Sequence, residues 1–347
     1  MSSTPNVYLP PEWAPQRGVL ITWPHDHSDW EENLPAVEDV FRELAGQISR
    51  FEDLVVTCRD EKHRRHIRNQ LVIGGVDPTR FSLHIARSND CWARDHGPIS
   101  VFDQDKPWLL NFVFNGWGNK YKSDLDNQIT SMLHAQGAFG DAGLRSIDFV
   151  LEGGSIDVDG EGTLLTTEHC LLSPKRNPGF SKEKIEHRLK TLLGVERILW
   201  LTAGHLAGDD TDSHIDTLAR FCSPDTIVHV SCDDPDDEHY AGLLAMQREL
   251  QALQSYSGRP YHLVPLPWPR PKFAADGRRL PASYANFLII NNAVLVPTYD
   301  DPVDVEALRR LKTCFPDREI IGIPCVPLIR QNGSLHCITM QLPAGVL

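Results

Sequence analysis

The sequence contains no run of eighteen apolar residues, so no segment is long enough to cross a membrane as a helix. Its first residues have neither a charged nor an apolar region, and we therefore expect no secretory signal. The eight cysteines are scattered along the chain and form no CxxC pair. This pattern argues against a disulfide framework and favours reduced thiols in a cytoplasmic protein.

Positively charged residues are in deficit, with 34 Lys and Arg against 47 Asp and Glu, which gives a formal net charge of −13. This balance argues against nucleic acid as a partner and is compatible with a small cationic substrate, although solubility alone also explains it. The chain has 347 residues, of which 41% are hydrophobic, and this is enough to bury a large core. Length alone leaves open two domains or one large domain built from repeats.

Hydrophobic patterns predict an α/β protein. Short apolar runs predict strands at residues 19–24, 54–58, 81–87, 99–102, 108–114, 197–202, 217–221, 226–231, 286–290, 293–296 and 319–323. Apolar residues at helical spacing predict helices at residues 35–50, 60–72, 181–193, 238–254 and 303–314. We expect Gly194 to cap the third of these helices, Pro297 to end its strand, and the Pro- and Arg-rich residues 255–280 to form a surface loop. The recurring strand-strand-helix-strand order fits both a radial arrangement and a doubly wound sheet.

The most informative cysteine is Cys337, which lies between the turn residues 332–334 and a segment of alternating apolar residues. We expect it at a strand edge, where the backbone can approach a ligand closely, although buried cysteines more often serve only in packing. His214 is the best candidate for proton transfer to or from this thiol. If a strand begins at His214, its side chain and that of Asp216 point to the same side. As the neighbour of Cys337 on a strand, His336 should point to the opposite face and serve in packing.

Carboxylates recur in similar polar turns at four positions: Asp95, Glu152, Asp210 and Asp216. Each acid alone could be part of a plain solvated turn. Four carboxylates gathered around one site would need a cation, which is either a metal ion or a charged substrate. A calcium loop would need a glycine where Ser213 stands, and a zinc site would need more ligands than His214 supplies. A planar guanidinium instead fits bidentate carboxylates well.

Five segments resemble the agmatine deiminase and bacterial-type peptidylarginine deiminase family of guanidino-group modifying enzymes. In chain order they are residues 89–98, 152–163, 176–178, 208–216 and 336–339. Each segment alone is a weak match, but all five follow the order of the family at plausible spacing over nearly the whole chain.

This resemblance implies an α/β fold, namely the five-bladed propeller of ββαβ units with pseudo-fivefold symmetry around a central active site. It also implies a single catalytic domain over residues 1–347. Cys337 would attack the guanidinium carbon, while Asp95 and Asp216 would hold the guanidinium nitrogens. His214 would protonate the departing ammonia and then activate water.

The resemblance further implies that Glu152 orients His214. Trp92 and Asp210 are the candidates for substrate contacts beyond the guanidinium. No cofactor and no metal ion would be required, because the substrate itself is the cation that balances the carboxylates.

We therefore expect a cytoplasmic hydrolase of polyamine metabolism that converts agmatine to N-carbamoylputrescine and ammonia through a covalent thiouronium. Its partner would be a small cationic guanidino substrate, with no nucleic acid and no membrane, and a homo-oligomer is compatible with the resemblance. The alternative is the same chemistry on peptidyl-arginine or on another guanidino compound. A non-catalytic guanidine- or polyamine-binding protein belongs to a different class and is disfavoured, because binding alone needs no nucleophile. A metal-dependent hydrolase is a third hypothesis.

Overall fold

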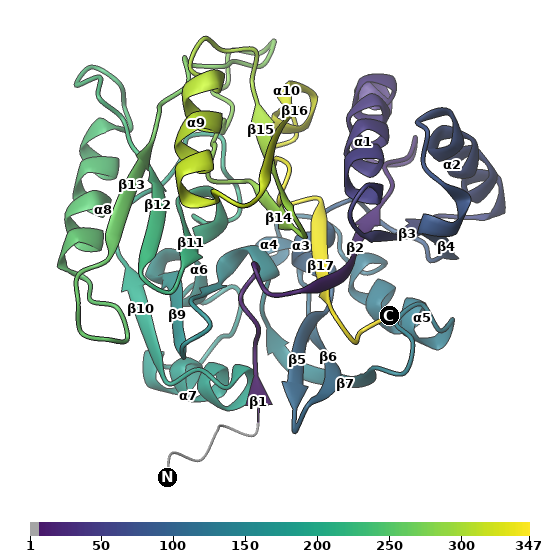
Figure 1. The fold of residues 1–347 in the computed structure, drawn as a ribbon, viewed down its shortest axis with the longest axis horizontal. Helices are drawn as coiled ribbons and strands as arrows, with labels where there is room; N and C mark the ends of the chain where they lie inside the picture. The colour runs from purple at the N-terminus through teal and green to yellow at the C-terminus, as the bar shows by residue number, and fades with distance from the viewer. Residues whose placement is uncertain (1–6) are drawn as a thin grey trace.

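The computed structural model describes residues 7–347, and the first residues, on which the expected absence of a secretory signal rests, lie outside it (Figure 1). In chain order its strands are β1 (Val7–Tyr8), β2 (Gln16–Thr22), β3 (Asp53–Cys58), β4 (Phe81–Ile85), β5 (Ile99–Asp103), β6 (Lys106–Val113), β7 (Gly143–Val150), β8 (Asp157–Val158), β9 (Thr163–Thr167), β10 (Arg197–Leu201), β11 (Ala219–Ser223), β12 (Thr226–Val230), β13 (His262–Leu266), β14 (Leu288–Ile290), β15 (Ala293–Thr298), β16 (Glu319–Pro324) and β17 (Thr339–Pro343). These strands form five separate sheets of three or four strands each. The strand orders are β17-β2-β3-β4, β1-β5-β6-β7, β10-β9-β8, β11-β12-β13 and β14-β15-β16.

Helices connect the strands and cover the sheets. The α-helices are α1 (Leu34–Ser49), α2 (Glu61–Ile73), α3 (Ala93–His96), α4 (Gly116–Asn119), α5 (Ile129–Ala135), α6 (Glu168–Leu171), α7 (Lys182–Leu193), α8 (Tyr240–Ala252), α9 (Asp304–Cys314) and α10 (Val326–Ile329). Short 3₁₀ turns are η1 (Glu31–Asn33), η2 (Pro78–Arg80), η3 (Asp126–Gln128), η4 (Gly153–Ser155) and η5 (Ile215–Thr217). None of the helices within residues 7–347 has the length and apolar character needed to cross a membrane.

One supersecondary unit recurs in all five sheets. Two antiparallel strands are followed by a helix and by a third strand that lies parallel to the second. The connecting helices are α1, α5, α7, α8 and α9. In one unit the first strand is β17, so the last strand of the chain pairs with β2 from its beginning. This recurrence confirms the strand-strand-helix-strand order expected from the hydrophobic pattern.

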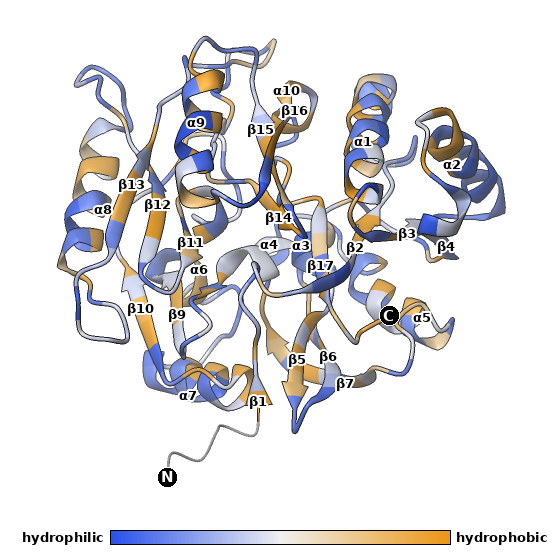
Figure 2. Ribbon diagram, in the orientation of Figure 1, coloured by the Kyte–Doolittle hydropathy of each residue, from blue (hydrophilic) through white to orange (hydrophobic). Residues whose placement is uncertain are grey.

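The helices form where apolar residues repeat at helical spacing. The predicted inner face of α1 is fully buried against the core: Val37, Val40, Phe41, Leu44, Ala45 and Ile48. By contrast, α2 buries only Ile67 and Leu71, so its charged residues form a solvated face that Figure 2 shows as largely hydrophilic. Gly194 ends α7 with φ of 70°, as predicted, because glycine adopts this left-handed conformation without steric cost.

Two local predictions were wrong. Residues 255–280 contain the strand β13, which pairs in parallel with β12 and was hidden by the surrounding prolines and arginines. Pro297 does not end β15, which continues to Thr298. A proline is tolerated there because β14 pairs only with Ala293–Leu295, so Pro297 lies beyond the stretch that is paired on both sides.

Candidate active site

Cys337 lies in the turn that connects α10 to β17, two residues before the strand that was expected to carry it. Its side chain is only 4% exposed. The Sγ atom lies 3.4 Å from Asn286 Oδ1 and 3.9 Å from Asp216 Oδ2. Burial, together with the carboxylates of Asp216 and Asp95, raises the pKa of the Cys337 thiol well above its ordinary value. The resting cysteine is therefore a thiol that can donate to the Asn286 amide oxygen.

Asp95 projects from the short helix α3 and is fixed at both oxygens. Oδ1 accepts a hydrogen bond from the backbone N–H of Gly154 at 3.1 Å, and Oδ2 accepts one from Trp117 Nε1 at 2.9 Å. Trp117 reaches this position from a left-handed backbone with φ of 55°. Burial, only partly opposed by His214, raises the pKa of Asp95 to about 6.

No strand begins at His214, so the condition for placing its side chain and that of Asp216 on one side of a strand is not met; His214 precedes the 3₁₀ turn η5. The preceding residues Asp212 and Ser213 both have positive φ, of 67° and 64°. Asp209 stabilises this bend, since its Oδ2 accepts from the backbone N–H of Ser213 at 2.8 Å. The turn carries both His214 and Asp216 into the interior, where each is completely buried.

The imidazole of His214 lies among the side chains of Asp95, Glu152 and Cys170. Its Nδ1 is 3.6 Å from Asp95 Oδ1, and neither ring nitrogen has a hydrogen-bond partner within residues 7–347. Burial alone would lower the pKa of His214, but Asp95, Cys170 and Glu152 together hold it well above its ordinary value. A buried imidazolium with free N–H groups can donate a proton to a reacting group.

Gly154 is required for these groups to meet. A Cβ atom added there would lie 2.6 Å from His214 Nδ1 and 3.0 Å from both Asp216 Oδ2 and Asp95 Oδ1. Any side chain would therefore displace the groups that surround the reacting centre.

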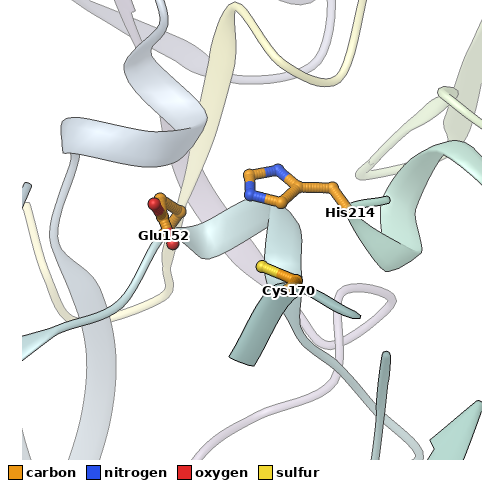
Figure 3. A group of neighbouring side chains, drawn as sticks. All are labelled: Glu152, Cys170 and His214. Atoms are coloured by element: carbon orange, nitrogen blue, oxygen red, sulfur yellow. The ribbon is translucent and has the colours of Figure 1, made fainter. Parts of the chain in front are cut away.

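Glu152 lies beside His214 but is paired elsewhere. Both of its oxygens contact Arg176 Nε, at 3.0 and 2.9 Å, and the two side chains are fully buried. Arg176 also donates to Asp212 at 2.6 Å. Figure 3 shows the imidazole of His214 extending toward Glu152, with Cys170 beside it.

Glu152, Cys170 and His214 offer ligand atoms that all lie within 4.8 Å of one another. A thiolate, an imidazole and a carboxylate are the ligands that a soft divalent metal ion prefers. However, Arg176 already occupies both Glu152 oxygens and places a positive charge beside that position. Glu152 and Cys170 are therefore better suited to holding His214 in place than to binding a metal ion.

Cys337 lines a pocket together with residues of several loops. Four aspartates line it, namely Asp29, Asp90, Asp95 and Asp210, and none of the lining residues found in the described chain is basic. The pocket therefore favours a cationic ligand electrostatically.

Both predicted outer contacts line this pocket. Trp92 packs against the backbone of Gly333 so closely that a Cβ atom there would lie 2.2 Å from the indole. Asp210 accepts hydrogen bonds from Tyr121 Oη at 2.6 Å and from Asn332 Nδ2 at 2.9 Å. Four of the seven predicted site residues line this pocket, namely Trp92, Asp95, Asp210 and Cys337. Asp216 contacts Cys337, His214 contacts Asp95, and Glu152 lies beside His214.

The prediction for His336 was wrong, because its ring is not a packing element. Nδ1 hydrogen-bonds with Asp216 Oδ2 at a distance of 2.8 Å, and Nε2 lies 2.9 Å from Glu12 Oε1. In a turn, unlike a strand, neighbouring side chains need not point to opposite faces. The bond from His336 and the positive charges around it outweigh burial and lower the pKa of Asp216.

Sequence reasoning also missed three other residues of the site. Arg176 lies in one of the five segments that resemble the family, and this position could have identified it as a site residue. Asn286, whose Oδ1 accepts from the backbone N–H of His336 at 2.9 Å, and Cys170 had no signal beyond residue type.

A buried thiol in an anionic pocket is the arrangement expected of an enzyme that attacks a cationic substrate through sulfur. The chain belongs to the Porphyromonas-type peptidyl-arginine deiminase family, whose model matches residues 8–343. It is thus a hydrolase of the type that acts on guanidino C–N bonds.

Several named proteins are similar to this chain over almost its whole length. The agmatine deiminase of Stutzerimonas stutzeri is 34% identical, over 99% of this chain and 98% of the relative. A cysteine-to-serine variant of the C. jejuni agmatine deiminase, solved with substrate bound, is 38% identical with a TM-score of 0.90, over 98% of this chain and 97% of that one. A chain from Porphyromonas gingivalis, provisionally named an arginine deiminase, is 50% identical with a TM-score of 0.91, over 98% and 99%.

Proposed function

We propose that this protein hydrolyses the guanidinium group of agmatine to N-carbamoylputrescine and ammonia through a covalent thiouronium on Cys337. The observation that carries the proposal is the placement of a buried thiol at the end of a pocket lined by four aspartates and no basic side chain. The names of several relatives, and a substrate-bound relative in which a cysteine is replaced, support agmatine as the substrate.

Binding of the guanidinium activates the nucleophile. In the resting site, burial and the negative charges of Asp216 and Asp95 raise the pKa of Cys337 and keep it protonated. A bound guanidinium places a positive charge beside the sulfur, which favours the thiolate, and the thiol proton leaves to solvent. Asp95 and the unpaired Oδ1 of Asp216 accept hydrogen bonds from the guanidinium nitrogens and hold the carbon in line with the sulfur.

The first half-reaction transfers the amidino group to sulfur. The thiolate attacks the guanidinium carbon, and the new C–S bond gives a neutral tetrahedral adduct. The imidazolium of His214 donates a proton to one amino group, the C–N bond breaks, and ammonia leaves. A cationic thiouronium remains on Cys337, with the two carboxylates still balancing its charge.

The second half-reaction releases the ureido product. The now neutral His214 takes a proton from water as the oxygen attacks the thiouronium carbon. The C–S bond then breaks, the C–O bond gains double-bond character, and the hydroxyl proton returns to the sulfur. Glu152, fixed by Arg176, keeps the imidazole oriented and favours its protonated form throughout.

The outer pocket suits a second positive charge. Agmatine carries an ammonium at the far end of its chain, and Asp210 and Asp29 both line the outer part of the site. We propose that Asp210 receives the ammonium and that Trp92 packs against the methylene chain.

A second candidate is deimination of arginine, free or in a peptide. The 50% identity to the Porphyromonas gingivalis chain favours this alternative, because it exceeds the 38% identity to the C. jejuni agmatine deiminase. A substrate with an α-carboxylate would place a negative charge near the aspartates of the outer pocket, which disfavours free arginine more than a blocked peptide.

The test is ammonia release from agmatine, free arginine and a blocked arginine peptide by the native protein and by Cys337→Ala. We expect release from agmatine at the highest kcat/KM and none from Cys337→Ala, whereas Cys314→Ala, which removes a partly exposed thiol of α9, stays active. No release from any of the three substrates refutes the hydrolase function for them. Full activity of Cys337→Ala refutes the thiol mechanism, and a higher kcat/KM for the peptide selects the second candidate.

We also propose that the five sheets are the blades of a propeller with pseudo-fivefold symmetry around the Cys337 site. The recurrence of one ββαβ unit in every sheet supports this arrangement. A single domain over residues 1–347, a homo-oligomeric assembly and a cytoplasmic location are proposals that rest on the family resemblance. The location is also supported by the eight cysteines, all of which are unbridged.

A further inference from the structure

His336 lies between two carboxylates that are far apart in the sequence, the fully buried Asp216 and the largely buried Glu12. Its Nδ1 lies 2.8 Å from Asp216 Oδ2, and its Nε2 lies 2.9 Å from Glu12 Oε1. Each ring nitrogen is thus within hydrogen-bond distance of one carboxylate oxygen, and the imidazole bridges the two acids. The ring is 1% exposed, so water does not compete for either bond.

Glu12 is itself held from several sides. Arg220 donates to Oε2, Gln341 donates to Oε2 at 2.8 Å, and Arg94 approaches Oε1 at 3.3 Å. A carboxylate with two guanidinium partners and an amide has little freedom to rotate. Glu12 therefore provides a rigid anchor for the imidazole of His336.

The anchored imidazole of His336 in turn restricts the orientation of the Asp216 carboxylate. One of its oxygens is occupied by His336, while Oδ1 is buried and has no hydrogen-bond partner in the described chain. Because the bond to His336 fixes the rotation of the carboxylate, it also determines where the free oxygen points. That oxygen is the one available to a guanidinium nitrogen beside Cys337.

We infer that His336, anchored by Glu12, is a positioning residue that orients Asp216 toward the cationic group of the substrate. This inference rests on the proposed function, because it assigns a direction to one of the two carboxylates that hold the guanidinium. It also gives a role to Glu12 and to the side chains of Arg94, Arg220 and Gln341 that hold it. A misplacement of about 1 Å in such a group lowers catalysis by about 100-fold.

Two substitutions of one residue separate positioning from packing. In His336→Asn, the amide nitrogen takes the place of Nδ1 and still donates to Asp216. In His336→Gln, the amide nitrogen takes the place of Nε2 and reaches Glu12 instead. We expect His336→Gln to lose about 100-fold in kcat/KM with agmatine, and His336→Asn to lose about tenfold or less.

A measurement that does not depend on turnover accompanies the kinetics. The rate of Cys337 alkylation is measured by mass spectrometry with chloroacetamidine, which is cationic, and with chloroacetamide, which is neutral. Only the cationic reagent uses Asp216, so the ratio of the two rates reports how well this carboxylate is placed. We expect the ratio to fall about tenfold in His336→Gln and to stay near the native value in His336→Asn.

Gln341→Leu is the matched control, because it removes a buried hydrogen bond to Glu12 without removing the contact between Glu12 and His336. We expect its alkylation ratio to stay within about twofold of the native ratio. Equal losses in His336→Asn and His336→Gln, or an unchanged ratio in His336→Gln, overturn the inference. If the native protein releases no ammonia from any guanidino substrate, the proposed function fails, while the alkylation ratios still decide the role of His336.

Discussion

Asp216→Asn is expected to make Cys337 more reactive while making the enzyme less active. Asp216 Oδ2 lies 3.9 Å from the sulfur and is the first charged group that raises the pKa of this thiol. Asparagine has the same shape, and its side-chain oxygen can still accept from His336. The substitution therefore removes one negative charge and little else.

The size of the first effect follows from the distance. Two unit charges about 4 Å apart interact with about 4 kcal/mol at an effective dielectric constant of about 20. Removing the carboxylate then increases the thiolate fraction at neutral pH by about a thousandfold. Because a thiolate of lower pKa is intrinsically a weaker nucleophile, with a Brønsted coefficient of about 0.5, the alkylation rate rises by about 30-fold.

The second effect has the opposite sign. The asparagine side chain would retain an oxygen but no charge, so a guanidinium would lose one of its two ionic partners in a buried site. Losing one partner of a buried charge pair costs about 2–5 kcal/mol, and kcat/KM for agmatine should fall by at least about 30-fold.

The assay compares chloroacetamide alkylation and ammonia release in the same preparations at pH 7. Asp210→Asn is the control, since Asp210 lies in the outer pocket and is not among the groups that shift the pKa of Cys337. It should keep the native alkylation rate. An alkylation rate in Asp216→Asn at or below the native rate would refute the electrostatic argument, and an unchanged kcat/KM would refute the role of Asp216 in binding.

Three further predictions concern other parts of the site. Arg176→Met leaves the buried Glu152 without its partner and should cost about 3–5 kcal/mol in the free energy of unfolding, measured with denaturant. Burial raises the pKa of Asp95 to about 6, and the neutral acid below that pH cannot hold a cation, so kcat/KM should fall about tenfold per pH unit below this value. A pH profile that stays flat from 7 to about 5 contradicts this assignment. Gly333→Ala places a Cβ atom 2.2 Å from Trp92, and the resulting shift of the indole should raise KM about tenfold while leaving the far-UV spectrum unchanged.

Local sequence was sufficient to predict most of the elements. The helical spacing in residues 34–49 and the glycine after α7 determine structure within a few residues, because helices are built from contacts three and four positions apart. The same holds for the hairpins of the recurring unit, whose partners are close in the chain. The strand β13 was not predicted because it is short, contains Pro265 and is stabilised by pairing with β12.

The sequence also determined the chemical character of the site. Residue types alone identified the thiol of Cys337, the imidazole of His214 and a set of carboxylates that require a cation. The family resemblance then assigned a role to each of them. Residue types can identify such candidates because a nucleophile, a base and counter-charges must be present whatever their arrangement.

Only the tertiary structure decided how these groups are held. Glu12 and His336 lie 324 positions apart, and no local pattern indicates that they form a hydrogen bond. Asn286 meets Cys337 across 51 positions, and Arg176 meets Glu152 across 24. Such contacts arise when separate units pack together and bury polar groups that must then find partners. The physical reason is that burial, rather than sequence neighbourhood, selects which polar side chains pair, and through this pairing it decides where the free oxygen of Asp216 points.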